Sequence, residues 1–310
     1  MALREPEVIG RLVRQLGIGR TGLQAAGDDG ALLAAEDRIV VTDAMVEGRH
    51  FNLAWSSWSD VGFKLLARNV SDIFAMGGRP TAMLLTLALP RSFGAAELEG
   101  FAQGLEAASA RWCNPVLIGG DTTATDGPAV LSLTLFGKTG LRTLRRSGGL
   151  PGHRLWVDGA LGHAAAGLAL LQAGRPEASP AAVAAHRRPG PEPLQPAAVR
   201  AASACIDVSD GLLLDATRLA EASGCGLRIA YRLPGLDAIL PLAESEAQAV
   251  AWQRSGGDDY VRLVAAPSSP GRGWYEVGLL TEAPGLRLEE RDGRFVEASP
   301  VGYLHTFGRL

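Results

Sequence analysis

Carboxylates recur in six short stretches of this chain, each beside Gly, Ser or Thr. The stretches are GDDGA (27–31), TDAMVEGRHF (42–51), NVSDIFAMGG (69–78), IGGDTT (118–123), IDVSDGL (206–212) and SGGDDY (255–260). Asp and Gly are common in turns, so a single stretch of this kind favours a structural role. Carboxylates gathered at one site repel one another unless cations neutralise them. Because Mg²⁺ prefers oxygen ligands and shares its coordination with phosphate, the set predicts a nucleotide site with several magnesium ions.

Other kinds of catalytic site find no support in the sequence. The chain has no GxxxxGK[ST] loop, so it is not a P-loop enzyme, and it lacks the protein-kinase lysine and catalytic-loop signatures. No Ser/His/Asp arrangement suggests a covalent step. We therefore expect metal-assisted transfer without a side-chain nucleophile.

Composition predicts a two-domain protein of the cytoplasm. The chain has 310 residues, is 47% hydrophobic and has a net charge of -3 without blocks of like charge, so we expect no nucleic-acid surface. Its three cysteines are scattered, which fits a reducing compartment. The N-terminal segment carries acids and has no long apolar core, so no signal peptide is expected. The most apolar stretch, 164–173, is too short to span a membrane.

Alternating strands and helices must position the acidic stretches, and we expect those stretches at strand or helix ends. Apolar patterns predict helices at 60–76, 95–112, 162–172, 211–223 and 242–254. Strands are expected at 38–42, 82–89, 116–118, 129–136, 154–157, 227–231, 260–265, 275–280 and 294–297. Six prolines in 174–196 favour a long exposed connection or a mobile loop. The turn-rich segment 145–153 predicts a boundary between two α/β (α+β) domains, 1–145 and 146–310.

Taken in order, these stretches resemble the thiamine-monophosphate kinase family of the aminoimidazole-ribonucleotide-synthetase-like superfamily. The similarity extends to RSGGLPG (146–152), HRRPGP (186–191) and GYLHTF (302–307). The resemblance implies an N-terminal mixed sheet with helices, used for metal, ATP and dimer contacts, and a C-terminal α/β domain that completes the cleft. It implies that ATP and Mg²⁺ are used to convert thiamine monophosphate to thiamine diphosphate in a cytoplasmic homodimer. Transfer would be in line, with charge neutralised by the metals.

The resemblance also assigns roles to individual residues. The metal ligands it implies are Asp29, Thr42 (through its hydroxyl or carbonyl oxygen), Asp43, Asp72, Asp121, Asp207 and Asp210. The residues it implies for ATP are Gly120, Asp121, Arg146 and Ser209, and those for the thiamine substrate are His50, Asp258 and Tyr303. Asp28 is the less favoured neighbour of Asp29, and an N-cap role is the alternative for Asp210. Asp215 lies beyond the motif, and we expect it at a solvated position on a helix.

Three positions depart from the family pattern. Asp258 stands where the family has glutamate, Phe101 followed by Ala102 displaces an adenine-stacking aromatic, and Glu192 stands where an arginine often follows the second proline. These departures keep an alternative open, namely a diverged member that binds ATP but phosphorylates another small acceptor or is non-catalytic. Selenophosphate synthetase and the hydrogenase-maturation relative are disfavoured, because no cysteine precedes Cys113 and the chain ends in FGRL.

Overall fold

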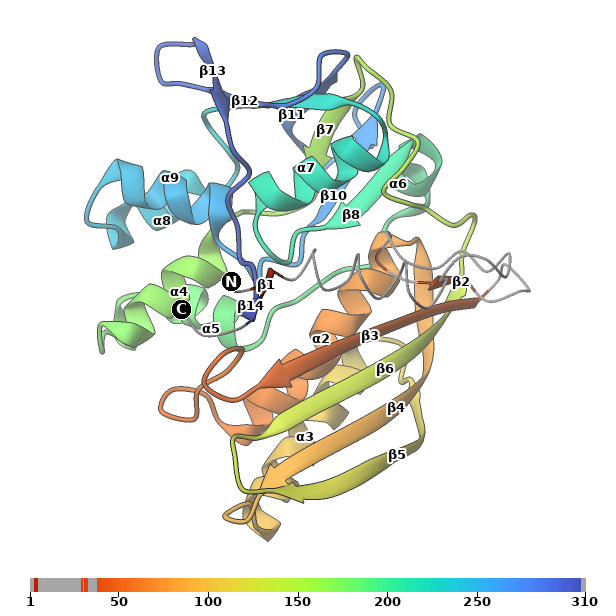
Figure 1. Cartoon of the computed structure of the whole chain (residues 1–310), viewed down its shortest axis with the longest axis vertical. Helices are drawn as coiled ribbons and strands as arrows, with labels where there is room; N and C mark the ends of the chain where they lie inside the picture. Colours follow the sequence, from red (N-terminus) through yellow and green to blue (C-terminus); the bar gives the residue numbers. More distant parts are fainter. Residues whose placement is uncertain (1–2, 5–28, 30, 33–37, 308–310) are drawn as a thin grey trace.

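The computed structural model describes residues 3–4, 29, 31–32 and 38–307 (Figure 1). Two large sheets, each flanked by helices, contain most of the described strands, and β1 (Leu3–Arg4) pairs with β14 (Thr306–Phe307). Asp28, the alternative to Asp29, lies outside the described residues. No helix in the described part of the chain has the length and apolar character needed to cross a membrane.

The first sheet has the strand order β2-β3-β6-β4-β5, in which β4 and β5 are parallel and the other neighbours antiparallel. Its strands are β2 (Ala31–Leu32), β3 (Arg38–Val46), β4 (Gly78–Pro90), β5 (Val116–Thr125) and β6 (Val130–Thr139). Buried and exposed residues alternate along β6, as expected for a sheet with one covered face.

Helices α2 (Trp58–Ala75) and α3 (Ala95–Arg111) cover one face of this sheet (Figure 1). A capping box starts α2, because the Ser57 hydroxyl accepts from the backbone N–H of Asp60 and the Asp60 carboxylate accepts from that of Ser57. The two helices cross so closely that a Cβ on Gly104 would lie 1.9 Å from the carbonyl oxygen of Ser59. This close crossing holds α2 between the sheet and the rest of the molecule.

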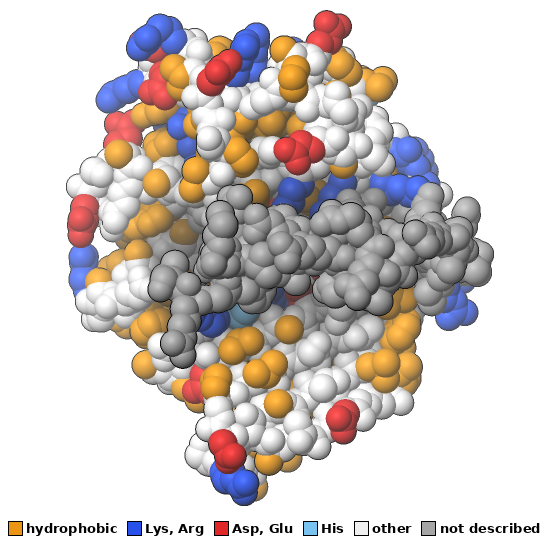
Figure 2. All heavy atoms as spheres, in the orientation of Figure 1, with side chains coloured by type: hydrophobic (Ala, Val, Ile, Leu, Met, Phe, Trp, Pro, Cys, Tyr) orange, Lys and Arg blue, Asp and Glu red, His pale blue; other side chains and the backbone are white. Residues whose placement is uncertain are grey.

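No helix among the described residues covers the opposite face of the first sheet, which is partly apolar. In Figure 2, hydrophobic side chains lie on the surface of this part of the molecule. The edge strand β5 is exposed along almost its whole length, and Val116, Leu117 and Ile118 are 61%, 51% and 60% exposed. A parallel edge strand with such side chains is a surface that proteins normally cover.

The second sheet has the order β13-β12-β9-β11-β7-β10-β8. Its strands are β7 (Arg154–Val157), β8 (Ala204–Asp207), β9 (Gly226–Ile229), β10 (Arg262–Ala266), β11 (Tyr275–Thr281), β12 (Leu286–Glu289) and β13 (Phe295–Ala298). Every residue of β8 and β10 is buried, because α7 (Leu212–Ala222) covers one face while α6 (Pro196–Ala201) and the end of α2 cover the other. Helix α2 is thus shared between the two sheets.

A helical cluster lies beside the second sheet (Figure 1). It contains α4 (His163–Gln172), α5 (Pro180–Arg187), α8 (Leu236–Ile239) and α9 (Glu246–Ser255), with the short turns η1 (Pro176–Ala178) and η2 (Leu240–Leu242). The expectation of a long exposed or mobile connection over 174–196 was therefore wrong in part. Pro180 stands in the first turn of α5, where its missing N–H costs nothing, and Ala182 and Val183 pack into the cluster.

The acidic stretches are not all at element ends, contrary to expectation. Asp43 lies inside β3 and Asp121 inside β5, because these two strands extend beyond their predicted bounds, and Asp72 lies inside α2, within the helix predicted at 60–76. The expected helices and strands all have counterparts in the structure, whereas β1, β2, β12, β14, α5, α6 and α8 were missed. Short elements of this kind carry little periodic pattern.

Candidate active site

A row of polar side chains runs along the side of α2 that faces the second sheet. Lys64, Arg68 and Asp72 follow one another at intervals of four residues, which places them on one side of the helix. Lys64 Nζ donates to Asp258 at 2.7 Å, and the Ser71 hydroxyl donates to Asp207 at 2.6 Å. Both acceptors belong to the part of the chain that builds the second sheet. The row therefore lines a cleft between the two sheets.

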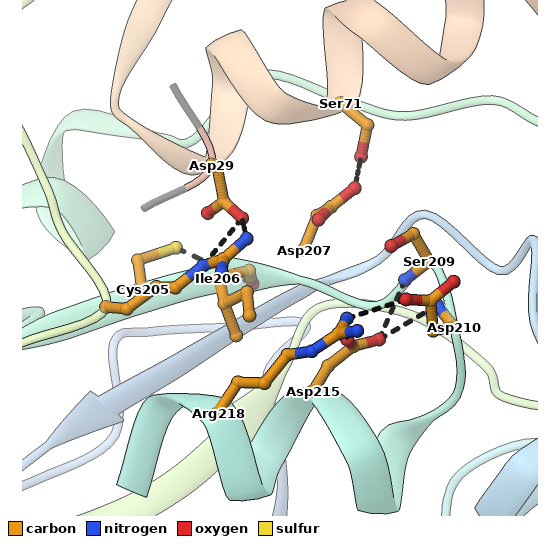
Figure 3. Close-up of polar contacts among 10 residues, drawn as sticks. Asp29, Ser71, Cys205, Ile206, Asp207, Ser209, Asp210, Asp215 and Arg218 are labelled. Atoms are coloured by element: carbon orange, nitrogen blue, oxygen red, sulfur yellow. Dashed lines mark hydrogen bonds and ion pairs between the residues drawn. The ribbon is translucent and has the colours of Figure 1, made fainter. Parts of the chain in front are cut away.

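Three carboxylates meet in this cleft. Oxygen atoms of Asp29, Asp72 and Asp207 lie within 4.8 Å of one another. Asp207 ends β8 and is 3% exposed. Figure 3 shows Asp29 and Asp207 between α2, which carries Ser71, and strand β8. All three residues were predicted as metal ligands from the sequence. They lie far apart in the chain, and the fold brings them together.

This cluster is electrostatically costly without a cation. Burial and the neighbouring carboxylates of Asp207, Asp43 and Asp29 raise the pKa of Asp72 well above its usual value. Burial and Asp29 likewise raise the pKa of Asp207. Burial raises the pKa of Asp29, although the Arg146 guanidinium beside it offsets part of the effect. Three converging carboxylates that resist ionisation are a donor set that fits a hard divalent cation.

Arg146 reaches the cluster, as its predicted role requires. Its Nε and Nη2 donate to Oδ1 of Asp29 at 3.0 and 2.5 Å. The neighbouring Arg145 contributes its backbone carbonyl to the Cys205 N–H. Of these two neighbouring arginines, Arg146 is the one whose side chain lies beside the carboxylates.

Asp43 and Thr42 lie on opposite faces of β3. Asp43 is half-buried on the face that α2 covers, with its carboxylate oxygens 3.4 and 3.5 Å from Arg68. Thr42 is exposed on the open face, and its hydroxyl donates to the carbonyl of Leu133 at 3.2 Å. The Thr42 hydroxyl is therefore directed away from the carboxylates, because neighbouring strand residues alternate between faces. A ligand role for its carbonyl oxygen stays a prediction.

The loop between β8 and α7 holds Ser209 and Asp210. Helix α7 starts at Leu212 with Gly211 as the preceding residue, so Asp210 is not its N-cap. The Asp210 carboxylate instead accepts from Nη1 of Arg218 at 2.6 Å. This contact leaves Asp210 at the edge of the cleft, with a cation already beside it (Figure 3).

The expectation that Asp215 is solvated was wrong. Its side chain is 1% exposed, and its Oδ2 accepts from the backbone N–H groups of Ser209 and Asp210, each at 3.0 Å. Burial and the nearby Asp210 raise the pKa of Asp215 to about 7, against the opposing charge of Arg218. Asp215 shapes the loop that carries two predicted site residues (Figure 3). Ser209 and Asp210 lie only six and five residues before Asp215, so this contact is local in the sequence.

Gly120 and Asp121 lie on the exposed edge strand β5, away from the cluster. Strand order places β6 and β4 between β3 and β5, so β3 and β5 are about 14 Å apart. Pairing through Ser132 and Thr86 aligns Asp121 with Ala44, on the open face of the sheet. A Cβ on Gly120 would lie 2.0 Å from the carbonyl oxygen of Leu85. Close packing against β4 therefore explains why glycine occupies this position. Within one chain, the described structure does not bring Asp121 to the other carboxylates.

A pocket of ≈ 490 Å³ opens beside the cleft and is lined by all three predicted substrate residues, His50, Asp258 and Tyr303. Aromatic side chains form much of its wall, namely Phe51, Trp55, Trp252 and Tyr303. Ser209, Asp210 and Arg68 also line it, so the pocket and the acidic loop share a boundary. Its size and mixture of aromatic and polar groups are typical of a small-molecule site.

His50 is neutral in this pocket. Burial, helped by the charge of Arg68, lowers the pKa of His50 to about 4. Its Nδ1 accepts from the backbone N–H of Val46 at 3.0 Å, so the ring proton lies on Nε2. The ring contacts those of Tyr303 and His305, with centroid distances of 6.3 and 5.1 Å. His305 belongs to the same GYLHTF segment as Tyr303 and was missed.

Asp258 already has a partner for each carboxylate oxygen. Oδ2 accepts from Lys64 Nζ at 2.7 Å, and Oδ1 accepts from the Tyr260 hydroxyl at 2.8 Å. Burial alone would raise the pKa of Asp258, but the charges of Lys64 and Arg68 hold it well below its usual range. Asp258 is therefore ionised and firmly positioned at the pocket wall.

The other two departures from the family pattern have structural roles. Phe101 is 3% exposed in the core between α2, α3 and the first sheet, so its ring is not offered to a ligand. Glu192 accepts from Nη2 of Arg111 at 2.6 Å on the surface. Neither residue belongs to the pocket.

Asp259, in the SGGDDY loop, should make the folding stability of the protein depend on pH. Its oxygens accept from the backbone N–H groups of Gly162 and Ala164 at the start of α4, and burial raises its pKa to about 7. The unfolded chain loses this proton near pH 3.8 and the folded chain near pH 7, so folding stability falls between these values.

In Asp259→Asn, which keeps the acceptor oxygen but cannot ionise, this fall is absent. We expect the variant to gain stability relative to the wild type as pH rises from about 4 to 7, by about 1–3 kcal/mol. Urea unfolding at several pH values measures the difference. A difference that does not change with pH would contradict the assignment.

Comparisons with known proteins agree with this geometry. Residues 27–139 match the model of the family described as AIR synthase related protein, N-terminal domain. Thiamine-monophosphate kinase of Caulobacter vibrioides is 35% identical over 96% of this chain and 89% of its own length. Thiamine-monophosphate kinase of Escherichia coli K12 is 38% identical over 90% of this chain and 87% of its own length.

The structural neighbours are consistent with these relatives. AaThiL complexed with AMPPCP and TMP superposes with a TM-score of 0.85 and 28% sequence identity, covering 98% of this chain and 97% of that one. The mixed α/β architecture with two sheets, expected from the sequence, is thereby confirmed.

Proposed function

Because the chain belongs to the thiamine-monophosphate kinase family, we propose that it transfers the γ-phosphoryl group of ATP to thiamine monophosphate, forming thiamine diphosphate and ADP. The observation that carries this proposal is the carboxylate cluster of Asp29, Asp72 and Asp207 beside an aromatic pocket large enough for a small molecule. A phosphate monoester is anionic already, so the reaction needs positioning and charge neutralisation more than a strong base.

Magnesium ions are the cofactor that these residues suit. Asp29, Asp72 and Asp207 would hold them, with Asp43 and Asp210 at the margins of the cluster. Bound magnesium supplies neutralisation of the charge on the phosphate groups that approach and leave. Arg146, next to Asp29, is placed to donate to a phosphate oxygen of ATP, and Ser209 lies on the loop that Asp215 shapes.

The pocket suits the organic part of thiamine monophosphate. Thiamine is an aromatic cation, and the walls contributed by Trp55, Trp252 and Tyr303 offer π-faces for it. His50 presents an Nε2–H donor and Asp258 presents a fixed negative charge. Ser209 and Asp210 line the end of the pocket next to the acidic loop, which is where the phosphate of the substrate belongs.

The working form is proposed to be a homodimer formed through the first sheet, whose edge strand β5 is exposed and whose open face no described helix covers. Asp121 is too far across that sheet to serve the cluster of its own chain. We therefore assign Asp121 and Gly120 of a second copy to the metal and ATP site. The division into an N-terminal domain (1–145) and a C-terminal domain (146–310), and the cytoplasmic location, stay predictions.

The first test is the release of ADP from ATP and Mg²⁺, with and without thiamine monophosphate. We expect ADP only with the acceptor, together with an equal amount of thiamine diphosphate. ATP binding without turnover would contradict the kinase and favour the diverged or non-catalytic alternative. Replacing Mg²⁺ by EDTA should abolish the reaction.

A mixed dimer tests the contribution of Asp121 in trans. Asp72→Asn and Asp121→Asn are each expected to be inactive. Subunits exchanged at equal amounts form heterodimers in which one of the two sites is intact, so about a quarter of wild-type activity should return. The control mixes Asp72→Asn with Asp207→Asn, which should stay inactive because both residues serve the same site. No recovery in the first mixture would place Asp121 in its own chain's site or outside any site.

A further inference from the structure

Arg68 stands at the pocket wall but has no part in the proposed metal, ATP or thiamine contacts. It belongs to the polar row on α2, its side chain is 16% exposed, and it lines the pocket together with His50 and Asp258. A guanidinium stays charged at all relevant pH values and is costly to bury without an anion. Arg68 therefore needs an anion close to its guanidinium.

Its present partner holds it loosely. Nε lies 3.4 Å from one carboxylate oxygen of Asp43, and Nη2 lies 3.5 Å from the other. Charge-assisted N–H···O bonds are normally 2.7–2.9 Å long. Within the described part of the chain, the guanidinium makes no other hydrogen bond. The guanidinium therefore has N–H groups that can donate to a ligand in the pocket.

Asp258 is not the missing anion, although it lies on the same wall. Lys64 and the Tyr260 hydroxyl occupy its two oxygens at 2.7 and 2.8 Å. The Lys64–Asp258 pair is neutral as a unit. The charge of Asp258 still acts on Arg68 through space, but no hydrogen bond joins the two, so Asp43 is the one carboxylate bonded to Arg68 among the described residues.

A divalent cation at Asp43 changes this balance. Asp43 faces the carboxylate cluster and contributes to the repulsion felt by Asp72. Once its charge is shared with a metal ion, Arg68 loses its counter-charge and is left next to another cation. A phosphate monoester can satisfy both, because one oxygen can meet the metal while two others accept from the planar guanidinium.

We propose that Arg68 binds the phosphate group of the acceptor, and that it becomes free to do so when a divalent cation takes Asp43. The proposal rests on the proposed function, since it takes thiamine monophosphate as the acceptor. It makes Arg68 the residue that distinguishes a phosphorylated acceptor from its unphosphorylated counterpart. Arg200, an exposed arginine on α6 that does not line the pocket, serves as the matched control.

The test compares Arg68→Met with Arg200→Met, which should bind like the wild type, by titration calorimetry. Thiamine monophosphate and thiamine are each titrated into protein that contains Mg²⁺ and AMPPCP. In Arg68→Met, the Kd of thiamine monophosphate should rise about 100-fold, because two charge-assisted hydrogen bonds are lost. The Kd values of thiamine and of AMPPCP should not change. Arg68→Lys keeps the positive charge but lacks the planar pair of N–H donors, so it should recover part of the lost affinity.

Two results would overturn the assignment: an unchanged Kd for thiamine monophosphate in Arg68→Met, or an equal loss of affinity for thiamine and thiamine monophosphate. In EDTA without nucleotide, wild type and Arg68→Met should bind thiamine monophosphate equally weakly. A 100-fold difference there would refute the dependence on the metal.

The result for Arg68 can be separated from that for the kinase activity. Wild-type protein that binds thiamine monophosphate through Arg68 but releases no ADP contradicts the kinase and supports Arg68. Protein that turns over normally and shows no Arg68 effect on binding contradicts Arg68 alone.

Discussion

Asp72→Asn is expected to lower turnover by about 1000-fold or more, because it removes charge from the centre of the carboxylate cluster where the metals would bind. The oxygens of Asp72 lie within 4.8 Å of those of Asp29 and Asp207, which come from other parts of the chain. The amide keeps the shape of the side chain, so the packing of α2 should persist. Steady-state ADP release with thiamine monophosphate measures the loss.

The same substitution should stabilise the metal-free protein. Burial and neighbouring carboxylates raise the pKa of Asp72 well above 3.8, so the wild type loses stability as pH rises from that value toward the folded-state pKa. Asparagine removes this loss. Thermal unfolding at pH 7.5 should therefore give a higher Tm for the variant in EDTA, whereas Mg²⁺ should raise the Tm of the wild type alone.

A matched control is Asp126→Asn. Asp126 is an exposed acid whose side chain pairs with Arg91 on the surface. It should leave turnover and the response to Mg²⁺ unchanged. If Asp72→Asn retained turnover, or if Mg²⁺ stabilised it as much as the wild type, Asp72 would not be a metal ligand.

Lys64→Met should destabilise the protein by about 3 kcal/mol, because it leaves the ionised carboxylate of Asp258, only 24% exposed, without its cationic partner. Lys64 is 3% exposed on α2, and its Nζ lies 2.7 Å from Asp258 in the SGGDDY loop. The pair links the first sheet's helix to the loop that leads into β10. Urea unfolding gives the stability, and the KM for thiamine monophosphate should rise as the pocket wall loses its fixed charge.

A double variant separates the ion pair from simple packing. Lys64→Met combined with Asp258→Asn removes both charges, so much of the lost stability should return. Lys138→Met, at an exposed position on β6, is the control for loss of a lysine. A double variant that is no more stable than Lys64→Met would mean that the pair contributes through packing and not through charge.

Local pattern explains what could be predicted before the structure. Buried helices such as α2 and buried strands such as β10 carry apolar runs, and the acidic stretches contrast with them. Short elements rich in proline and alanine, such as α5, were missed because their stability comes from packing with α4. Asp215 was misjudged for a similar reason, since its burial depends on a loop that folds back over the start of α7.

Residue chemistry by itself determined that this protein has an acidic, metal-suited site and, through ordered motifs, which family it resembles. Tertiary structure alone decided which acids meet. Asp29, Asp72 and Asp207 converge because α2 packs between the two sheets, whereas Asp121 stays apart because β6 and β4 lie between its strand and β3. It also decided that Lys64 and Arg68 belong to the pocket wall. Distances across a sheet or between two packed sheets follow from strand order and helix packing, which are long-range properties that no local stretch of sequence encodes.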